Sequence, residues 1–383
     1  MFALAVIAAS LLAGSLIYCV LVVAAARQYL SQKSAPPEKH APISVLKPLA
    51  GVDEGLRTNL RSFYTQNHPE FELLFAVREA TDPAVQVVEA LRAEFPARAT
   101  RLIVTGEPPY PNAKVFSLER MLARAQYDLL VMSDSDIRVD PGFLASIAAE
   151  FNDEYVALAT CPYRAVAGPS VWSRMEADGM NTDFLAGLLV ARMIEGVKFA
   201  VGPTVAARKS ALQAIGGFPV LKDYLAEDFV MGKFAAEAGV GVILSHSIVE
   251  HRIGSQGFGA NAAHRLRWVR STRRSRPLGY LGQLFTYPLP LGVIVWGLHP
   301  RWWPALILAC AFRFLAAWST SVSVLQSPPN WLLLPVQDVL NFLFHLAGFF
   351  GNTIVWRGRR YYLYPDGRFE LVGERPGVNA AKD

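Results

Sequence analysis

Two carboxylates, two residues apart, are the first feature of the sequence that could carry out chemistry. Asp134 and Asp136 directly follow residues 127–132 (YDLLVM), an apolar run typical of a buried strand. If these residues form a turn, both carboxylates can point to the same side of that turn. Hard cations such as Mg²⁺ and Mn²⁺ prefer oxygen ligands, and Mg²⁺ commonly bridges carboxylates to a diphosphate. The pair therefore predicts metal ligands at Asp134 and Asp136, with an ordinary turn as the alternative.

A second acidic site, Glu227 and Asp228, lies at the start of a helix-like stretch. Asp favours the amino-terminal end of a helix, and that structural role alone would explain its position. A carboxylate held at a helix start can also accept a proton from a substrate. Asp228 is therefore a candidate general base.

Arginine is concentrated in one short segment. Residues 265–276 contain six Arg, and His264 immediately precedes them. Such a segment can lie on anionic lipid, where each cation contributes about 1 kcal/mol, or it can bind a diphosphate through forked hydrogen bonds. Binding to nucleic acid is not expected, because the rest of the chain has neither a basic excess nor a nucleic-acid motif.

The elements that must position these groups alternate between strand and helix. Apolar runs predict strands at 43–49, 71–77, 101–105 and 127–132, and helix-like periodicity covers 54–65, 84–95 and 117–125. This alternation predicts an α/β fold with a parallel sheet covered on both faces. Ligands of such sheets bind beyond the carboxyl ends of the strands, which is where Asp134 and Asp136 lie.

The composition indicates that the chain combines a soluble domain with membrane segments. Of its 383 residues, 52% are apolar and 18% are charged, with a net charge of +5. A soluble domain is nearer about a quarter charged, whereas a disordered chain would be charged and poor in aromatic residues. The three cysteines exclude a disulfide framework and a cysteine-rich zinc site.

The amino terminus is predicted to be a membrane anchor. Residues 1–26 carry no charged side chain, and they exceed the roughly 20 residues that span a bilayer. The first charge, Arg27, follows this run, which predicts an external amino terminus and a cytoplasmic continuation. A cleaved signal peptide is the alternative, but the run is too long and lacks a basic start. We therefore expect an anchor over 1–26 and a proline-broken linker over 27–42.

A second apolar block is predicted to form carboxyl-terminal membrane helices over 281–356. Its three apolar segments are 283–298, 303–325 and 331–356. The arginines that begin residues 357–383 indicate a cytoplasmic tail, whereas three spans that start inside would end outside. One segment is therefore expected to be interfacial or re-entrant, and the first, which Pro288 and Pro290 interrupt, is the candidate.

Polar residues in the third segment have two possible roles. Gln337, Asp338, Asn341 and His345 recur about one helical turn apart. Polar groups inside a membrane either join helices by hydrogen bonds or serve a functional site, and the sequence leaves both roles open.

Taken in chain order, these sites resemble the ceramide glucosyltransferase family. These are membrane-bound, inverting, nucleotide-sugar-dependent enzymes (family 2/21-like), and the resemblance extends to their bacterial hopanoid-associated branch. It runs from about Ser44 to about Tyr280, and residues 46–51 (LKPLAG) resemble the family's opening strand and loop. It implies a glycosyltransferase A (Rossmann-like nucleotide-diphospho-sugar transferase) domain over 43–280, in the cytoplasm, with amino-terminal and carboxyl-terminal transmembrane helices.

The resemblance also implies roles for individual carboxylates. Asp82, within Thr-Asp-Pro-Ala, matches the family's first Asp and would hold the uracil and ribose. Lys114, within Asn-Ala-Lys, would contact the nucleotide or diphosphate. Asp134 matches the second Asp and would bind the nucleotide and metal, whereas Asp136 occupies a position that varies in the family. Asp228 matches the third Asp, the implied catalytic base.

The basic segment carries the last motif. Arg267 and Trp268 match the end of the family's [Gln/Arg]-x-x-Arg-Trp signature, but His264 replaces its first residue. Neutral His can donate a hydrogen bond but lacks the permanent charge of Arg. Arg267 would stabilise the leaving diphosphate, and Trp268 would stack on the sugar or the lipid headgroup, or pack in the core. Contact of His264 with diphosphate or with acceptor is left open.

The expected activity is inverting transfer of a hexose, glucose or N-acetylglucosamine, from a UDP-sugar to a hydroxyl of a membrane lipid. The acceptor would be ceramide-like or a hopanoid, Asp228 would be the base, and a divalent metal (Mg or Mn) would bind at Asp134. The chain is expected to be a multi-pass protein of a bacterial inner membrane, with its catalytic domain in the cytoplasm. A processive polysaccharide synthase and a non-enzymatic membrane scaffold or transporter are the alternatives. The first would need a larger channel-forming bundle, and the second would leave the acidic sites without a role.

Overall fold

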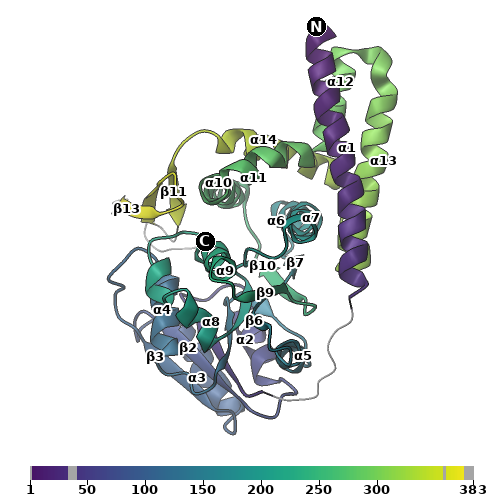
Figure 1. The fold of residues 1–383 in the computed structure, drawn as a ribbon. Coiled ribbons are helices and arrows are strands. Elements are labelled where there is room, and N and C mark those ends of the chain that lie inside the picture. Colours follow the sequence, from purple (N-terminus) through teal and green to yellow (C-terminus); the bar gives the residue numbers. More distant parts are fainter. Residues whose placement is uncertain (1, 33–40, 357–358, 375–383) are drawn as a thin grey trace.

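The computed structural model describes residues 2–32, 41–356 and 359–374 of the chain (Figure 1). Parts of the predicted linker and of the predicted tail lie outside the described residues, namely 33–40 in the linker and 357–358 and 375–383 in the tail. An α/β domain forms the lower part of the molecule in Figure 1, and a narrow bundle of helices projects from it.

A seven-stranded sheet in the order β3-β2-β1-β4-β8-β6-β9 forms the centre of the domain. Its strands are β1 (Ile43–Pro48), β2 (Phe71–Val77), β3 (Thr100–Val104), β4 (Leu129–Ser133), β6 (Val156–Thr160), β8 (Thr204–Arg208) and β9 (Gly241–Leu244). The four predicted strands pair in parallel, as expected. However, β8 is antiparallel to β4 and β6, and several strands and helices separate it from β4 in the chain.

Helices cover both faces of this sheet. One face carries α2 (Leu56–Tyr64), α3 (Ala84–Glu94) and α5 (Phe143–Glu150), and the other carries α4 (Ala113–Leu122), α8 (Lys209–Ala214) and α9 (Glu227–Glu237). Successive side chains of a strand point to opposite faces. Leu129 and Val131 of β4 pack with the first set, and Leu130 and Met132 pack with the second. Burial on both faces explains the unbroken apolar run of β4, which ends where Asp134 leaves the sheet.

A second, three-stranded sheet lies after the carboxyl end of β4. It consists of β5 (Ile137–Arg138), β10 (Val249–Ile253) and β7 (Tyr163–Ala167), with β10 in the middle. The chain then continues from β7 through α6 (Val171–Gly179), η1 (Met180–Phe184) and α7 (Leu185–Glu195), and from β10 into α10 (Phe258–Ser275). These elements bring three distant parts of the sequence to the edge where ligands of α/β sheets bind.

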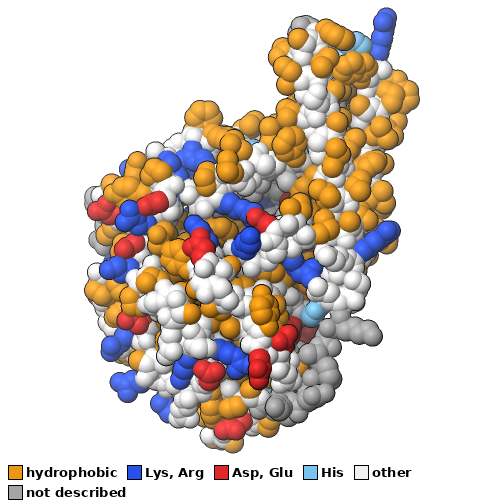
Figure 2. Space-filling view, in the orientation of Figure 1, with side chains coloured by type: hydrophobic (Ala, Val, Ile, Leu, Met, Phe, Trp, Pro, Cys, Tyr) orange, Lys and Arg blue, Asp and Glu red, His pale blue; other side chains and the backbone are white. Residues whose placement is uncertain are grey.

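The projecting bundle contains the helices that could cross a membrane. Within the described ranges, α1 (Phe2–Leu30) and the segment Pro300–Val324, which includes α13 (Trp303–Ala317), are long and apolar enough to do so. A third span results if the bent pair Pro277–Thr286 and Pro288–Leu298 (α12) is one broken span, with a 62° bend. Apolar side chains cover the bundle, whereas charged side chains gather on the α/β domain (Figure 2).

The third apolar segment forms a helix that is shorter than the predicted segment 331–356. Its helix α14 (Leu334–Gly348) runs across the base of the bundle (Figure 1) and is not among the candidate spans. Its buried face is polar and includes Asp338 and His345, while Val339 and Leu343 are exposed. High average hydropathy therefore reflects an outward apolar face on a helix that is anchored to the α/β domain by its polar side.

Part of the predicted tail, residues 357–383, forms strands. Strands β11 (Thr353–Trp356), β12 (Arg359–Leu363) and β13 (Phe369–Glu374) form an antiparallel sheet. Phe369 packs with Leu225, and its backbone N–H donates to the carbonyl of Asp223 at 2.9 Å. The predicted boundary at residue 356 falls between β11 and β12, and this sheet supports the loop that leads to Asp228.

Part of the arginine cluster has a structural role that we did not predict. Arg270 Nη1 donates to the Thr353 carbonyl at 2.7 Å, and Arg273 Nη2 donates to the Gly351 carbonyl at 2.8 Å. Both carbonyls belong to the chain that follows α14 and enters β11. These arginines of α10 thus hold the connection between α14 and β11 against the domain.

Candidate active site

The structure brings three of the predicted site residues into one cluster. Lys114 in the first turn of α4 lies with its Nζ 2.7 Å from Asp134 Oδ1 and 3.0 Å from Glu227 Oε1. Asp228 follows Glu227 in the first turn of α9. Burial alone would lower the pKa of Lys114, but the charges of Asp134, Glu227 and Asp228 raise it above its ordinary value. Lys114 is therefore a permanent cation among three carboxylates.

Asn112 fixes the backbone that carries Lys114. Its side-chain oxygen accepts from the Val115 N–H at 3.1 Å and caps α4, while its Nδ2 donates to the Tyr224 carbonyl at 2.8 Å. Capping by Asn satisfies a backbone donor that the helix leaves unpaired. The Asn-Ala-Lys motif thus joins α4 to the loop before Asp228, and this geometry explains why Asn precedes Lys at that spacing.

Asp228 lies against Gly202, where a larger residue would displace its carboxylate. A Cβ placed on Gly202 would stand 2.8 Å from Asp228 Oδ2. The loop that contains Gly202 also contacts Asp134, because the Asp134 N–H donates to the Pro203 carbonyl at 3.1 Å. Burial first, and the charge of Glu227 second, raise the pKa of Asp228 to about 7, while Lys114 opposes this shift. A carboxyl with a pKa near neutrality is suited to accept and release a proton.

The raised pKa of Asp228 predicts the pH dependence of any reaction in which it is the base. A protonated carboxyl cannot accept a proton, so kcat/KM should rise as the pH increases through about 7 and level off above it. Glu227→Gln removes a like charge and should move this rise to lower pH, whereas Lys114→Met should move it to higher pH. A profile that is flat or falls between about pH 6 and about pH 8 would contradict the assignment.

Lys47 is a buried residue of the site that the sequence did not single out. It lies in β1, is 0% exposed, and donates from Nζ to the Asp134 carbonyl at 2.7 Å and to Ser133 Oγ at 3.2 Å. Burial lowers its pKa to about 7 against the opposing charges of Asp134 and Asp136. Lys47 therefore holds the turn that presents both carboxylates. Glu227 is not among the charges that act on it, so the Glu227→Gln profile distinguishes Asp228 from Lys47.

Asp82 lies on the parallel side of the sheet, separate from this cluster. Its carboxylate accepts from the Gly51 N–H at 3.1 Å and from the Ala84 N–H at 2.9 Å. It thereby closes the loop after β1 onto the start of α3. This loop lies beyond the carboxyl ends of β1 and β2, where α/β sheets bind nucleotides.

Asp134 and Asp136 fit a metal ion only in part. Asp136 Oδ2 lies 3.2 Å from His251 Nε2, and its Oδ1 is buried without a hydrogen-bond partner among the described residues. Burial would raise the pKa of Asp136, but His251 holds it below its ordinary value. No group of three His, Cys, Asp or Glu side chains in the described ranges could enclose a metal. The donor set therefore fits an ion that takes its remaining ligands from a diphosphate and water, as Mg²⁺ usually does.

His264, which replaces the first residue of the family's Arg-Trp signature, is paired with a carboxylate of α6. His264 Nδ1 lies 2.5 Å from Glu176 Oε1, and Asn261 Nδ2 donates to Glu176 Oε2 at 2.5 Å. Glu176 is 5% exposed, and sequence reasoning missed it because 88 residues separate it from His264. A carboxylate on Nδ1 fixes the orientation and tautomer of an imidazole.

Trp268, one turn along the same helix, contacts His264 and Phe184 with ring centroids 5.4 and 5.9 Å apart. Arg267 is partly buried beside it.

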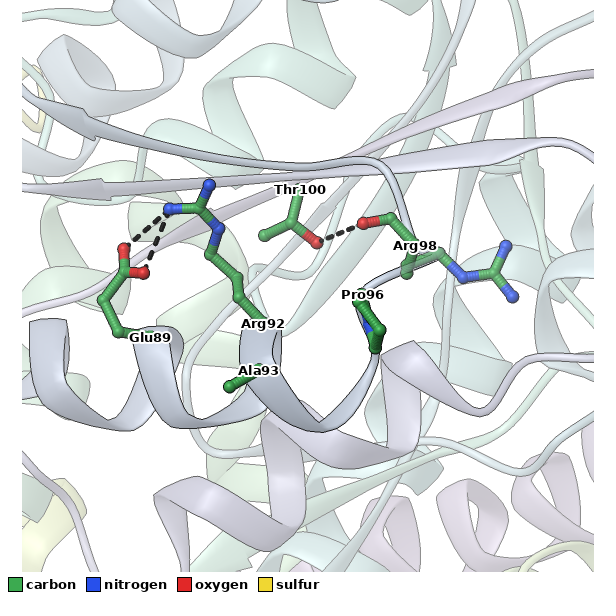
Figure 3. Close-up of a pocket in the computed structure, with 6 residues that line it drawn as sticks. All are labelled: Glu89, Arg92, Ala93, Pro96, Arg98 and Thr100. Atoms are coloured by element: carbon green, nitrogen blue, oxygen red, sulfur yellow. Dashed lines mark hydrogen bonds and ion pairs between the residues drawn. The ribbon is translucent and has the colours of Figure 1, made fainter.

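A surface depression elsewhere on the domain has no connection with these residues. It is lined by residues of α3, of the loop that follows and of the start of β3 (Figure 3), namely Glu89, Arg92, Ala93, Pro96, Arg98 and Thr100. Its one visible ion pair joins Arg92 Nη1 to Glu89 Oε1 at 2.8 Å. An i, i+3 pair of this kind is typical of an exposed helix face.

Comparison with known proteins identifies the family. The model of glycosyl transferase family 21 matches residues 6–369, nearly the whole chain. The chain belongs to glycosyl transferase family 21. This confirms the predicted resemblance to the ceramide glucosyltransferase family.

Relatives and a solved structure agree with membership of family 21. The chain is 27% identical to ceramide glucosyltransferase 3 of Caenorhabditis elegans over 343 residues, which is 84% of this chain and 72% of that protein. It is 29% identical to ceramide glucosyltransferase 1 of the same organism over 218 residues, which is 56% of this chain and 46% of that protein. The match therefore spans about half the length of the latter relative.

A solved structure of another glycosyltransferase has a similar fold. The mannosyltransferase PcManGT of Pyrobaculum calidifontis, in complex with GDP-Man and Mn²⁺, has a TM-score of 0.56 at 18% identity, over 90% of this chain and 99% of that one. The predicted glycosyltransferase A type of domain in this family 21 chain is thereby confirmed.

Proposed function

We propose that this protein transfers a hexose, glucose or N-acetylglucosamine, from a UDP-sugar to a hydroxyl of a membrane lipid, with inversion at the sugar carbon. The observation that carries the proposal is the cluster of Lys114, Asp134 and Glu227 beside Asp228, at the ligand-binding edge of the sheet. The ceramide glucosyltransferases among its relatives, and the apolar helices beside the domain, support a lipid acceptor.

The chemistry is a single displacement. Asp228 accepts the proton of the lipid hydroxyl as that oxygen forms a bond to the sugar carbon, and the bond from this carbon to the UDP oxygen breaks. Negative charge then grows on the diphosphate, and Lys114 and Arg267 are the cations assigned to it. Groups that are fixed in place before the reaction stabilise such charge most effectively. Asp82 holds the uracil and ribose in this proposal.

A divalent ion, Mg²⁺ or Mn²⁺, would be held by Asp134, with Asp136 as a further ligand. Bound there, it would supply positive charge to the diphosphate. PcManGT was solved with Mn²⁺, and the donor set described above fits an ion shared with a nucleotide.

Asp134→Ala should remove the effect of metal on nucleotide binding. We expect Mn²⁺ to strengthen UDP binding to the unsubstituted protein by about tenfold or more, equivalent to about 1.4 kcal/mol. Calorimetry of UDP with and without Mn²⁺ measures this. Asp136→Ala, which also removes the contact between Asp136 and His251, should retain part of the effect of Mn²⁺ on UDP binding. Equal enhancement by Mn²⁺ in Asp134→Ala and in the unsubstituted protein would contradict the assignment of Asp134.

The substrates can be identified directly. Membranes that contain the protein are incubated with labelled UDP-glucose or UDP-N-acetylglucosamine and with ceramide, diacylglycerol or a hopanoid polyol, and the lipids are separated by thin-layer chromatography. A labelled lipid of one sugar is expected, and no labelled lipid with any pair would overturn the proposal. A long polymer would instead indicate a processive synthase, although the described residues contain at most three candidate spans.

A further inference from the structure

Helix α14 and the residues at its two ends present apolar side chains to the outside of the protein. These side chains recur at intervals of three or four residues, which places them on one face of the helix. Their exposed fractions range from 40% to 88%. We call the set the apolar stripe, and it consists of Leu332, Val336, Val339, Leu343, Leu346 and Phe350.

The opposite face of α14 is polar and buried. Asp338 and His345 are 2% and 1% exposed. Asp338 accepts from Arg313 at 2.7 Å, and Asn341 donates to Asp183 at 2.8 Å. A helix at the surface of a water-soluble protein has the reverse arrangement, with its apolar side toward the core. Because these buried bonds fix the rotation of α14, the apolar stripe cannot turn inward.

The apolar stripe adjoins the bundle and shares its character. Helix α14 runs across the base of the bundle (Figure 1), and it meets the start of α12 where Tyr287 packs against Phe342 and His345, with ring centroids 5.5 and 5.4 Å apart. Apolar side chains also cover the outside of the bundle (Figure 2). Between residues 326 and 356, Asp338 is the only Asp, Glu, Lys or Arg in the sequence.

These properties identify what covers the apolar stripe. An exposed apolar patch of this kind marks an interaction surface for a protein or a membrane. A protein interface has a polar rim around its apolar centre, whereas this patch continues without charged side chains into helices long and apolar enough to cross a membrane. Lipid chains are therefore the partner that fits it.

The depth of α14 along the bundle follows from its contact with Arg313. The preceding residue, Phe312, lines a groove between α13 and α1 together with Cys19. Cys19 precedes Arg27, the first charged residue of α1, by eight residues, which is about 12 Å of helix. Helix α14 thus lies within the apolar length of the bundle, near its charged end. Interfacial helices are buried to a similar depth, about 5–10 Å below the headgroups.

We infer that α14 lies in the plane of the bilayer, at the surface of one leaflet, with the apolar stripe among the lipid chains. The helix has 15 residues, which extend over about 22 Å and fall short of the roughly 30 Å of the hydrocarbon core. This makes the third apolar segment an interfacial part of the carboxyl-terminal block rather than a span.

The in-plane position of α14 fixes the height of the candidate site relative to the membrane. Arg265 of α10 donates to Asn341 at 3.0 Å, and the same helix carries His264, Arg267 and Trp268. The buried polar side of α14 therefore holds the helix of the candidate site, while its apolar side rests in lipid. The inference goes beyond the proposed function, because it concerns how the chain meets the bilayer, whichever sugar and acceptor it uses.

Fluorescence quenching by lipids measures the depth of α14. In a Cys310→Ser background, which removes the exposed native thiol, Val336→Cys and Leu346→Cys are made singly and labelled with bimane. The full chain is reconstituted into vesicles of phosphatidylcholine and phosphatidylglycerol whose acyl chains carry a nitroxide either near the headgroup or near the chain end. Ile7→Cys and Ile17→Cys in α1 are the matched control pair, since these residues are 58% and 63% exposed and also ten residues apart.

We expect equal depths for the two labels on α14 and depths about 15 Å apart for the two labels on α1, because a helix rises about 1.5 Å per residue. A separation of about 15 Å between the α14 labels would overturn the inference, since the helix would then cross the bilayer. Absence of quenching by either lipid at both α14 labels, while the α1 labels are quenched, would also overturn it. Water or a protein partner, such as a second copy of the chain, would then cover the apolar stripe.

Two features keep this experiment decisive. Val339 and Leu343 offer two further positions on the apolar stripe if a substitution at Val336 or Leu346 prevents folding. The depths are measured without any sugar nucleotide or acceptor, so a failure of the inference is distinguishable from a failure of the proposed function.

Discussion

Asp228→Asn is expected to abolish sugar transfer while leaving UDP-sugar binding intact. The amide has the size of the carboxylate but cannot accept a proton, so general-base catalysis, which typically contributes about 10²- to 10⁴-fold, is lost. Binding should persist because the groups assigned to the nucleotide, Asp82, Lys114 and Asp134, are unchanged. Initial rates of labelled glycolipid formation, together with calorimetric titration of UDP, measure the two quantities separately.

Asp223→Asn is the matched control for this experiment. Asp223 precedes Asp228 by five residues, and its carboxylate lies outside the cluster formed by Lys114, Asp134 and Glu227. Its backbone carbonyl, which accepts from Phe369, is unaffected by the substitution. The control should keep nearly full activity. Turnover in Asp228→Asn comparable to that of Asp223→Asn would exclude Asp228 as the base.

Arg313→Met should destabilise the protein more than other substitutions in the bundle. Arg313 is 5% exposed within the candidate span Pro300–Val324. Its guanidinium makes two 2.7 Å contacts with Asp338 of α14 and one 2.7 Å contact with Asp183 of η1. Removing the cation leaves the buried carboxylate of Asp338 and the partly buried carboxylate of Asp183 without compensation, and breaking a buried pair in this way costs about 3–5 kcal/mol. The midpoint of thermal unfolding in detergent should fall accordingly.

Two further variants show whether the loss comes from the uncompensated charge. Arg301→Met replaces an exposed arginine at the start of the same span and should leave the midpoint unchanged. Arg313→Met combined with Asp183→Asn and Asp338→Asn removes the unpaired charges and should recover most of the loss, because neutral replacements of buried ion pairs are often tolerated. An unfolding midpoint of Arg313→Met equal to that of Arg301→Met would contradict the role of this ion pair.

The same ion pair decides between the two roles that the sequence left open for the polar residues of the third apolar segment. Asp338 bonds α14 to Arg313 in the candidate span Pro300–Val324, and Asn341 bridges Asp183 at 2.8 Å and Arg265 at 3.0 Å. These contacts join helices, as one of the two roles requires. They also tie the bundle to α10, the helix that carries His264, Arg267 and Trp268.

The sequence predicted the parts of the fold whose signals are local. The strand β4 and the carboxylates after it were predictable, because burial on both faces gives a continuous apolar run and ligands bind where such strands end. The position of α14 was not predictable, since hydropathy averages over a helix and does not show which face is buried. The antiparallel direction of β8 was not predicted for a similar reason, because strand direction depends on pairing between distant segments.

The candidate site shows the same limit. Asp134, Lys114 and Asp228 could be found because each lies in a short recognisable motif. Lys47 and Glu176 could not, because their function depends on partners 87 and 88 residues away. A lysine inside an otherwise apolar strand was the one available signal for Lys47, since a charged residue is rarely buried without a partner.

The configuration of the sugar in the product tests the central claim most directly. Purified protein in lipid vesicles is supplied with an α-linked UDP-hexose and the acceptor found by the lipid screen, and the glycolipid is examined by proton NMR. A single displacement assisted by one base predicts a β-linked sugar on the lipid hydroxyl. An α-linked glycolipid, or UDP release without any lipid-linked sugar, would contradict the account.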